Sequence, residues 1–136
     1  MQHKNIIITG ATDGIGLAAA KSIAKKGYHV SLVGRNPDKG KKALETVVEH
    51  SGNENLDFFE CDLSLVANVK DLADRIKQKH SKIDVLLNNA GGANKTKQIT
   101  SEGLEKTFAT NQMNYFVLST ELLNLSLIHI SEPTRR

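Results

Sequence analysis

Four short runs of β-branched and apolar residues alternate along the chain with longer stretches of helical periodicity. The runs occupy residues 5–9, 29–33, 56–61 and 83–88. The helical stretches occupy residues 14–26, 37–50, a segment after Ser64, and residues 101–123. Strands that alternate with helices in this way form a parallel sheet with right-handed crossovers and helices on both faces. We therefore expect an α/β fold, a doubly wound parallel sheet.

Local signals set the expected ends of the helices. Gly27 can supply a left-handed cap after the first helix. Asn36 is a typical N-cap, with Pro37 at the first helical position. Ser64 and Thr100 are the expected N-caps of the third and fourth helices.

Composition excludes several classes of protein. The chain has 136 residues, which is one domain at most, and its 18 basic and 15 acidic residues give a net charge of +3. The basic residues are scattered, so nucleic acid is not an expected partner. No apolar run reaches the eighteen or so residues of a membrane helix, and the N-terminus lacks the pattern of a signal peptide. Together with the single cysteine, Cys61, these features predict a cytoplasmic protein that does not bind membranes.

The segment at 9–16, TGATDGIG, joins the first run to the first helix. Glycine at positions 10, 14 and 16 lets the backbone turn sharply and lets a pyrophosphate approach the helix N-terminus. A buried strand, then glycines, then a helix is the context that such a site needs. The sequence therefore predicts dinucleotide binding, and the alternative is a merely tight turn.

The glycine spacing G-x-x-x-G-x-G with its leading Thr9 resembles the short-chain dehydrogenase/reductase family. Three further motifs occur in the family's order, namely Asp62-Leu63 after the third run, Asn88-Asn89-Ala90-Gly91 after the fourth, and Asn111 in the last helix. The resemblance covers residues 1 to about 124, and residues 100–123 look most like the retinol-dehydrogenase-like branch. It implies a Rossmann-like, NAD(P)-binding domain in residues 1–124 with strand order 3-2-1-4, the later strands being missing.

The resemblance also implies an activity, the interconversion of a carbonyl and an alcohol by hydride transfer to or from NAD(P)(H). The implied cofactor-binding residues are Gly10, Thr12, Asp13, Gly14, Ile15, Gly16, Arg35, Asn36, Asp62, Leu63, Asn89, Ala90 and Gly91. The implied partner is a small-molecule carbonyl or alcohol. Residues 101–123 could also form a contact between subunits, because the family often uses this helix for homo-oligomers.

The end of the second run decides between the two nicotinamide cofactors. An acidic residue there would bind the ribose hydroxyls and repel a 2′-phosphate. This chain has Gly34-Arg35-Asn36 instead, and Arg35 can pair with the phosphate. We therefore expect NADP(H) rather than NAD(H). Asp13 argues the other way, since NADP-dependent members of the family often carry a basic residue near that position, and Arg35 could be a solvated loop cation.

Only one member of the implied catalytic tetrad is present. Asn111 would help hold a water in the proton relay, or it is simply a polar residue in a long helix. The tyrosine that acts as general acid/base is followed four residues later by a lysine in the family. Here Tyr28 is followed by Leu32 and Tyr115 by Ser119, so the motif does not occur. The chain as given is therefore expected to be inactive.

Residues 125–136, LSLIHISEPTRR, depart from the family pattern. Read as codons, residues 125–135 correspond to the transposase adapter used in preparing sequencing libraries. We expect this segment to be an artefactual tail, and the alternative is a natural frayed end. Excluding it would leave the fourth strand as an uncovered apolar edge.

Two other functions remain open. One is a nucleotide-binding pseudoenzyme or regulatory module that performs no catalysis. The other is a non-redox Rossmann protein, such as a nucleotide-sugar epimerase or a methyltransferase, against which the glycine spacing argues. The five histidines show no metal-ligand spacing, so no metal is expected. Cys61 reads as a small buried hydrophobe.

Overall fold

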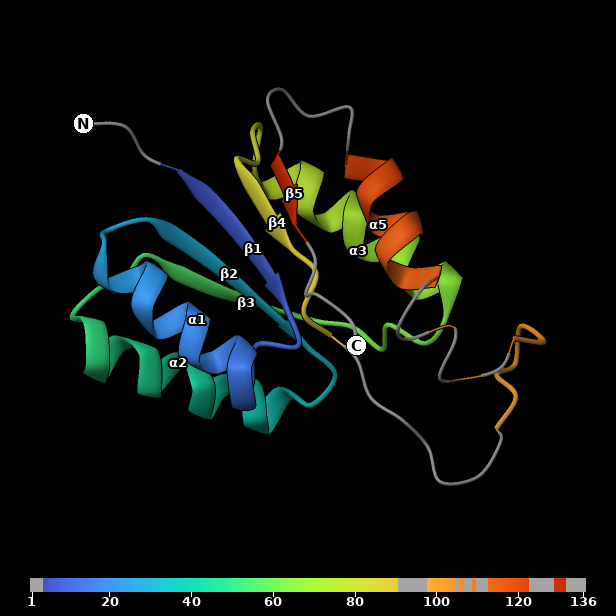
Figure 1. The fold of residues 1–136 in the computed structure, drawn as a ribbon, viewed down its shortest axis with the longest axis horizontal. Coiled ribbons are helices and arrows are strands. Elements are labelled where there is room, and N and C mark those ends of the chain that lie inside the picture. Colours follow the sequence, from blue (N-terminus) through green and yellow to red (C-terminus); the bar gives the residue numbers. More distant parts are fainter. Residues whose placement is uncertain are drawn as a thin grey trace.

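A computed structural model describes residues 4–90, 98–104, 106, 109, 113–122 and 129–131 (Figure 1). The strands are β1 (Asn5–Thr9), β2 (His29–Gly34), β3 (Leu56–Glu60), β4 (Val85–Leu87) and β5 (His129–Ser131). The helices are α1 (Gly14–Lys25), α2 (Pro37–Ser51), α3 (Val66–Lys79) and α5 (Asn114–Leu122).

The strands form one parallel sheet in the order β3-β2-β1-β4-β5. The predicted α/β class and the predicted order 3-2-1-4 are confirmed for the first four strands. After β1 the chain crosses to β2 on one side of it, whereas β4 lies on the other side of β1. The segments that follow the carboxyl ends of β1 and β4 therefore lead to opposite faces of the sheet. Open sheets bind ligands at such a switch point.

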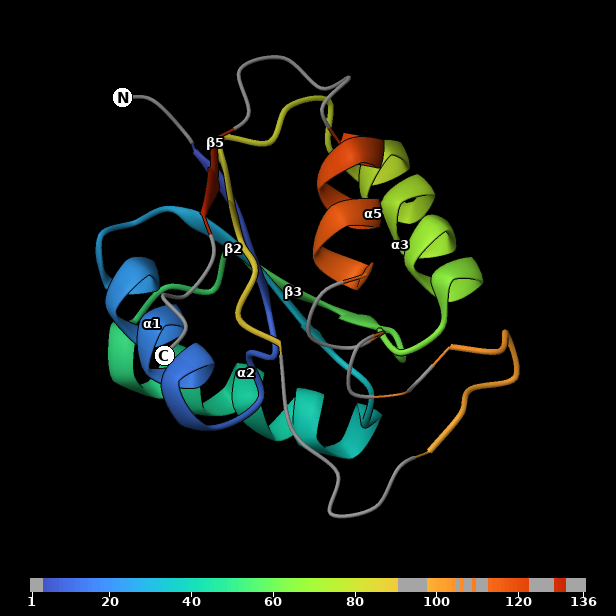
Figure 2. The ribbon, with the colours of Figure 1, turned by 45° about the vertical axis from the view of Figure 1, so that its right-hand side comes forward.

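Helices cover both faces of the sheet, α1 and α2 on one side and α3 and α5 on the other (Figures 1 and 2). The central strand β1 supplies both cores. Ile6 and Ile8 pack with residues of α1 and α2, whereas Ile7 packs with residues of α3 and α5. This two-sided burial explains why the strand reads as a continuous apolar run without alternation.

Several helix ends lie where their signals place them. The Asn36 side chain accepts hydrogen bonds from the backbone N–H groups of Asp38 and Lys39, at 2.9 and 3.1 Å, and caps α2. Gly27 follows α1 with φ +90°, as expected for a left-handed cap.

The predicted capping role of Ser64 is wrong. The N-cap of α3 is Leu65, and its side chain cannot accept a hydrogen bond. The carboxylate of Glu102 caps this helix instead, accepting the N–H groups of Val66 and Ala67. Ser64 turns back to Asp62, whose Oδ1 accepts its backbone N–H at 3.0 Å and its hydroxyl at 2.7 Å.

The predicted helix over 101–123 does not begin at residue 101. Residues 101–103 form a turn with Gly103 at φ +82°, and the Thr100 hydroxyl accepts the N–H groups of Glu102 and Leu104. Thr100 therefore closes a turn and does not begin a long helix. Residues 106, 109 and 113 are also helical, and the continuous helix described in this region is α5, Asn114–Leu122.

In the full chain β4 is covered, so the uncovered apolar edge expected for the chain without residues 125–136 stays a prediction. β5 pairs with β4 in parallel, with Leu86 opposite Ile130. An exposed strand edge offers unpaired N–H and C=O groups to any short extended segment, and the Ile-His-Ile sequence is suited to extended backbone. β5 lies within residues 125–136, whose assignment as an artefactual tail stays a prediction.

Among the described residues, no helix is both long enough and apolar enough to cross a membrane.

Candidate functional site

The site predicted from the sequence lies along the carboxyl edge of the sheet, where β1, β2, β3 and β4 end. The link between β1 and β4 is specific. The Thr9 hydroxyl accepts the backbone N–H groups of Asn89 at 2.9 Å and Ala90 at 3.0 Å. The Asn89 side-chain amide donates to the carbonyl oxygen of Gly10 at 3.2 Å. These bonds hold the glycine turn against the segment that follows β4.

The glycine turn is too crowded for other residues at two of its positions. A Cβ on Gly16 would lie 2.1 Å from the carbonyl oxygen of Gly10 and 2.6 Å from the Asn89 side chain. A Cβ on Gly10 would lie 2.8 Å from the Cα of Ala90, and Gly10 has φ +62°. Glycine is therefore required here because two backbone segments touch.

Gly14 differs, because its surroundings are open. It has φ +56°, yet no atom lies within 4 Å of a Cβ built on it. It begins α1, whose N-cap Asp13 makes no capping hydrogen bond through its side chain and whose first turn carries no acidic residue. Ile15 beside it is 80% exposed. An open helix N-terminus with glycine in front is a binding site for an anionic group such as a pyrophosphate.

The end of β2 brings Arg35 to the same edge. Gly34 is buried, and a Cβ there would lie 2.7 Å from the Thr12 methyl group. Arg35 is exposed beyond it and lines a hollow of about 330 Å³. The other lining residues are Glu60, Cys61, Asp62, Asn68, Asp71 and Arg75.

Asp62 keeps its negative charge at this edge. Burial would raise the pKa of its carboxyl, but hydrogen bonds from Ser64 and the charges of Lys106 and Arg35 outweigh burial and hold the pKa below its usual value. A carboxylate is a hydrogen-bond acceptor only. Asp62 is thus suited to accept an amino or hydroxyl group of a ligand in the hollow.

The remaining predicted residues occupy different environments. Asp13 is exposed and pairs with Lys39 of α2, the two charged atoms being 3.5 Å apart. Asn36 is engaged in capping α2. Leu63 is buried in the core beneath α3, so its side chain does not face the hollow. Gly91 and Asn111 lie outside the described residues.

One neighbour of the site, Arg75, was not foreseen from the sequence, whereas Asn88 belongs to the motif after the fourth strand. Arg75 of α3 lines the hollow, where its guanidinium donates to Asp71 and to the carbonyl oxygen of Glu60, both at 2.9 Å. Asn88 is buried and its amide donates to the Ser119 hydroxyl at 3.3 Å, which ties α5 to the end of β4. The sequence around Arg75 carries no sign that this residue lines the hollow, because only the packing of α3 against β3 brings its side chain there.

The residues present fit a dinucleotide at this edge. The crowded Gly10 and Gly16 bring the backbone close, Gly14 leaves space before the helix, and Arg35 and Asp62 stand at the hollow beyond.

Cys61, predicted to be a buried hydrophobe, is buried in the core. Burial raises the pKa of its thiol to about 12, so it is no nucleophile at neutral pH.

Comparison with known proteins agrees with this geometry. The family model described as short chain dehydrogenase matches residues 4–130. The bovine dehydrogenase/reductase SDR family member 12 is 40% identical over 117 residues, which are 86% of this chain and 37% of the relative. Human polyprenol dehydrogenase is 35% identical over 118 residues, 87% of this chain and 36% of the relative. The chain thus spans little more than a third of these relatives.

A solved structure supports the same relationship. The short-chain dehydrogenase from Sphingobium yanoikuyae in complex with NADPH superposes with a TM-score of 0.73 at 26% identity. The superposition covers 90% of this chain and 47% of that one.

Proposed function

The chain belongs to the short chain dehydrogenase family, and on that premise we propose that it is the cofactor-binding part of an oxidoreductase that prefers NADP(H) and interconverts a carbonyl and an alcohol. The observation that carries this proposal is the contact of the glycine turn with Asn89 and Ala90, beside the open N-terminus of α1. A merely tight turn would not need two backbone segments packed this closely in front of an uncapped helix.

Each part of the site has one task in this proposal. The N-terminus of α1 would hold the pyrophosphate with its backbone N–H groups. Arg35 would hold the 2′-phosphate, and Asp62 would accept the adenine amino group. Asn89 and Ala90, which contact the glycine turn, would hold the ribose. The bound cofactor supplies or accepts the hydride.

The proton step needs residues that this chain does not contain. Neither Tyr28 nor Tyr115 is followed by lysine four residues later. We therefore propose that the chain binds the cofactor but does not turn over substrate, and that Asn111 serves the proton relay in the complete protein. The single cysteine supports a reducing compartment, and we place the protein in the cytoplasm.

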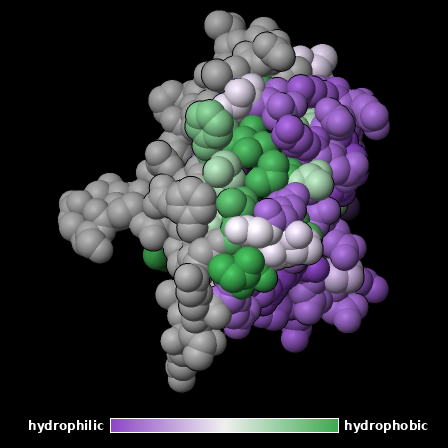
Figure 3. All heavy atoms as spheres, turned by 90° about the vertical axis from the view of Figure 1, so that its right-hand side faces the viewer, coloured by the Kyte–Doolittle hydropathy of each residue, from purple (hydrophilic) through white to green (hydrophobic). Residues whose placement is uncertain are grey.

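The complete protein is proposed to form a homo-oligomer through the face of α5. Phe116 on this helix is 69% exposed. The side of the molecule that carries α3 and α5 shows hydrophobic atoms gathered beside hydrophilic ones (Figure 3). A Phe116→Ser variant is expected to shift sedimentation toward the monomer, and unchanged sedimentation contradicts this contact.

Binding and turnover are tested separately. NADPH fluorescence should rise on mixing with the chain and should not rise with the Gly14→Asp variant, whose carboxylate fills the space meant for the pyrophosphate. Absorbance of NADPH at its nicotinamide band should stay constant with carbonyl substrates present. No fluorescence change with the unmodified chain overturns cofactor binding, and NADPH oxidation above the Gly14→Asp level overturns the proposed inactivity.

A further inference from the structure

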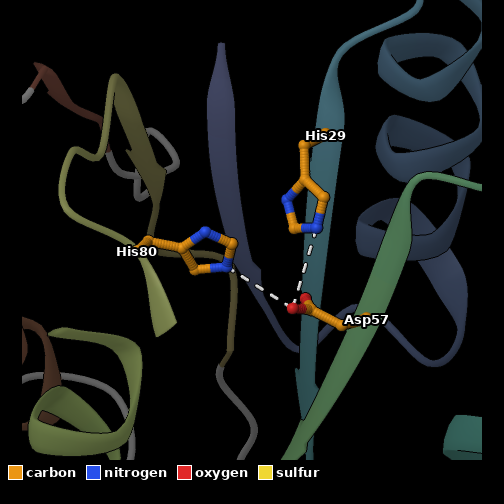
Figure 4. A group of neighbouring side chains, drawn as sticks. All are labelled: His29, Asp57 and His80. Carbon is orange, nitrogen blue, oxygen red and sulfur yellow. Dashed lines mark ion pairs between the residues drawn. The ribbon is translucent and has the colours of Figure 1, made fainter. Parts of the chain in front are cut away.

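Three potential metal ligands meet at the amino end of the sheet, opposite the cofactor edge (Figure 4). His29 is the first residue of β2, Asp57 is the second residue of β3, and His80 follows the last residue of α3. Asp57 stands opposite Ser31 in the register of the two strands, and Ser31 shares its face of β2 with His29. His80, at the end of α3, lies on this same face of the sheet.

The distances within this His29–Asp57–His80 cluster do not suit hydrogen bonds. Asp57 Oδ2 lies 3.7 Å from His29 Nε2 and 3.4 Å from His80 Nε2. Ligand atoms about 2.0–2.1 Å from a tetrahedral zinc ion stand about 3.4 Å apart from one another. All three candidate ligand atoms lie within 4.8 Å of one another, so a small closure would bring them around one ion.

The cluster is shielded from water. The side chains of Asp57 and His80 are each 10% exposed, and that of His29 is 12% exposed. His80 Nε2 is buried and has no hydrogen-bond partner among the described residues. A buried ring nitrogen aimed at a carboxylate without bonding it is a costly arrangement unless something lies between them.

The donor set of the cluster also suits a metal ion. Two imidazoles and one carboxylate are a ligand set of the kind that zinc takes in proteins, with a fourth position for water.

We propose that His29, Asp57 and His80 form a zinc site that ties β2, β3 and the end of α3 together. This site is independent of the proposed cofactor site at the other edge of the sheet. Sequence spacing does not predict this site, because residues 29, 57 and 80 are brought together only by strand register and the end of a helix.

Lys79 is the competitor for this site. Its ammonium nitrogen lies 2.8 Å from Asp57 Oδ2, where it supplies the positive charge that a metal ion would otherwise supply. The Lys79 side chain is 55% exposed, so it can turn to solvent when zinc binds. Removing the charge of Lys79 should therefore strengthen zinc binding. If the Asp57–Lys79 ion pair serves only to stabilise the fold, the chain should bind no zinc with or without Lys79.

The experiment titrates the full 136-residue chain with Zn²⁺ against a chromophoric chelator and, in parallel, with Co²⁺. We expect one zinc per chain at micromolar affinity or tighter, and a Co²⁺ absorption spectrum typical of a tetrahedral site with nitrogen and oxygen ligands. His29→Gln and His80→Gln should each weaken binding at least about tenfold. Lys79→Met should strengthen it.

The exposed His50 of α2 offers a matched control, since His50→Gln removes an imidazole from a helix on the opposite face of the sheet. Zinc affinity should be unchanged in this variant. The proposal is overturned if the unmodified chain binds no zinc, or if His50→Gln weakens binding as much as His80→Gln. Circular dichroism shows whether His29→Gln and His80→Gln fold. If either does not, the zinc stoichiometry of the unmodified chain and the zinc affinity of Lys79→Met still test the proposal.

Discussion

The hydroxyl of Thr9 accepts the backbone N–H of Asn89 at 2.9 Å, joining the carboxyl ends of β1 and β4 across eighty positions of the sequence. The same oxygen accepts the N–H of Ala90. Thr9 is fully buried, so water cannot replace it. One side chain therefore fixes the segment that would face a nicotinamide ribose relative to the glycine turn that would face the pyrophosphate.

Replacing Thr9 with valine keeps the shape and removes the acceptor. We expect Thr9→Val to lower the free energy of unfolding by about 1–3 kcal/mol, the usual cost of losing a buried hydrogen-bond partner. Urea denaturation followed by circular dichroism measures it. The control is Thr46→Val on α2, where the hydroxyl only donates to the Lys42 carbonyl near the surface. Equal losses in the two variants contradict the role given to Thr9.

The two glycines that flank Ile15 should respond differently to alanine. Gly16→Ala places a methyl group against the Gly10 carbonyl oxygen, so the turn must shift. We expect a loss of about 1–3 kcal/mol of stability and a loss of NADPH binding.

Gly14→Ala meets no atom and should cost only about 1 kcal/mol, the strain of a positive φ. Urea denaturation and NADPH fluorescence on both variants test this difference. If Gly14→Ala destabilises the fold as much as Gly16→Ala, the crowding described at Gly16 does not control the turn.

Cys61 should be inert in the folded chain. Its thiol is buried and burial raises its pKa to about 12, so the reactive thiolate is scarce even at pH 9. Reaction with Ellman's reagent at pH 8 should be slow in buffer and complete once urea has unfolded the chain. Rapid stoichiometric reaction of the folded chain would show that the end of β3 is open.

Much of the frame was predictable because it depends on local signals. The run Ile6-Ile7-Ile8 indicates a strand that is buried on both sides. Asn36 before Pro37 indicates the start of α2. The glycine turn was predictable too, since its spacing reflects a backbone contact that few other residues permit.

The misses concern contacts between distant parts of the chain. Ser64 has the chemistry of a helix cap, yet Asp62 binds it and Glu102 caps α3 from thirty-six positions away. The periodicity of residues 101–123 does not reveal the turn at Gly103. His29, Asp57 and His80 likewise meet only through strand register and the position of the end of α3.

The preference for NADP(H) depends on Arg35 at the end of β2. Arg35→Gln removes the charge that would pair with the 2′-phosphate, and Arg75→Gln is the matched control because Arg75 lines the same hollow but is already paired with Asp71. A charge-assisted hydrogen bond contributes about 1.5–3 kcal/mol, or about tenfold to a hundredfold in affinity.

The most direct measurement is therefore a titration of the chain and of both arginine variants with NADPH and with NADH. We expect NADPH to bind more tightly than NADH. Arg35→Gln should weaken NADPH binding by at least about tenfold and leave NADH binding unchanged, and Arg75→Gln should have the smaller effect on NADPH binding. Equal affinity for the two cofactors, or an Arg35→Gln variant that binds NADPH like the unmodified chain, would contradict the assignment of this edge as an NADP(H) site.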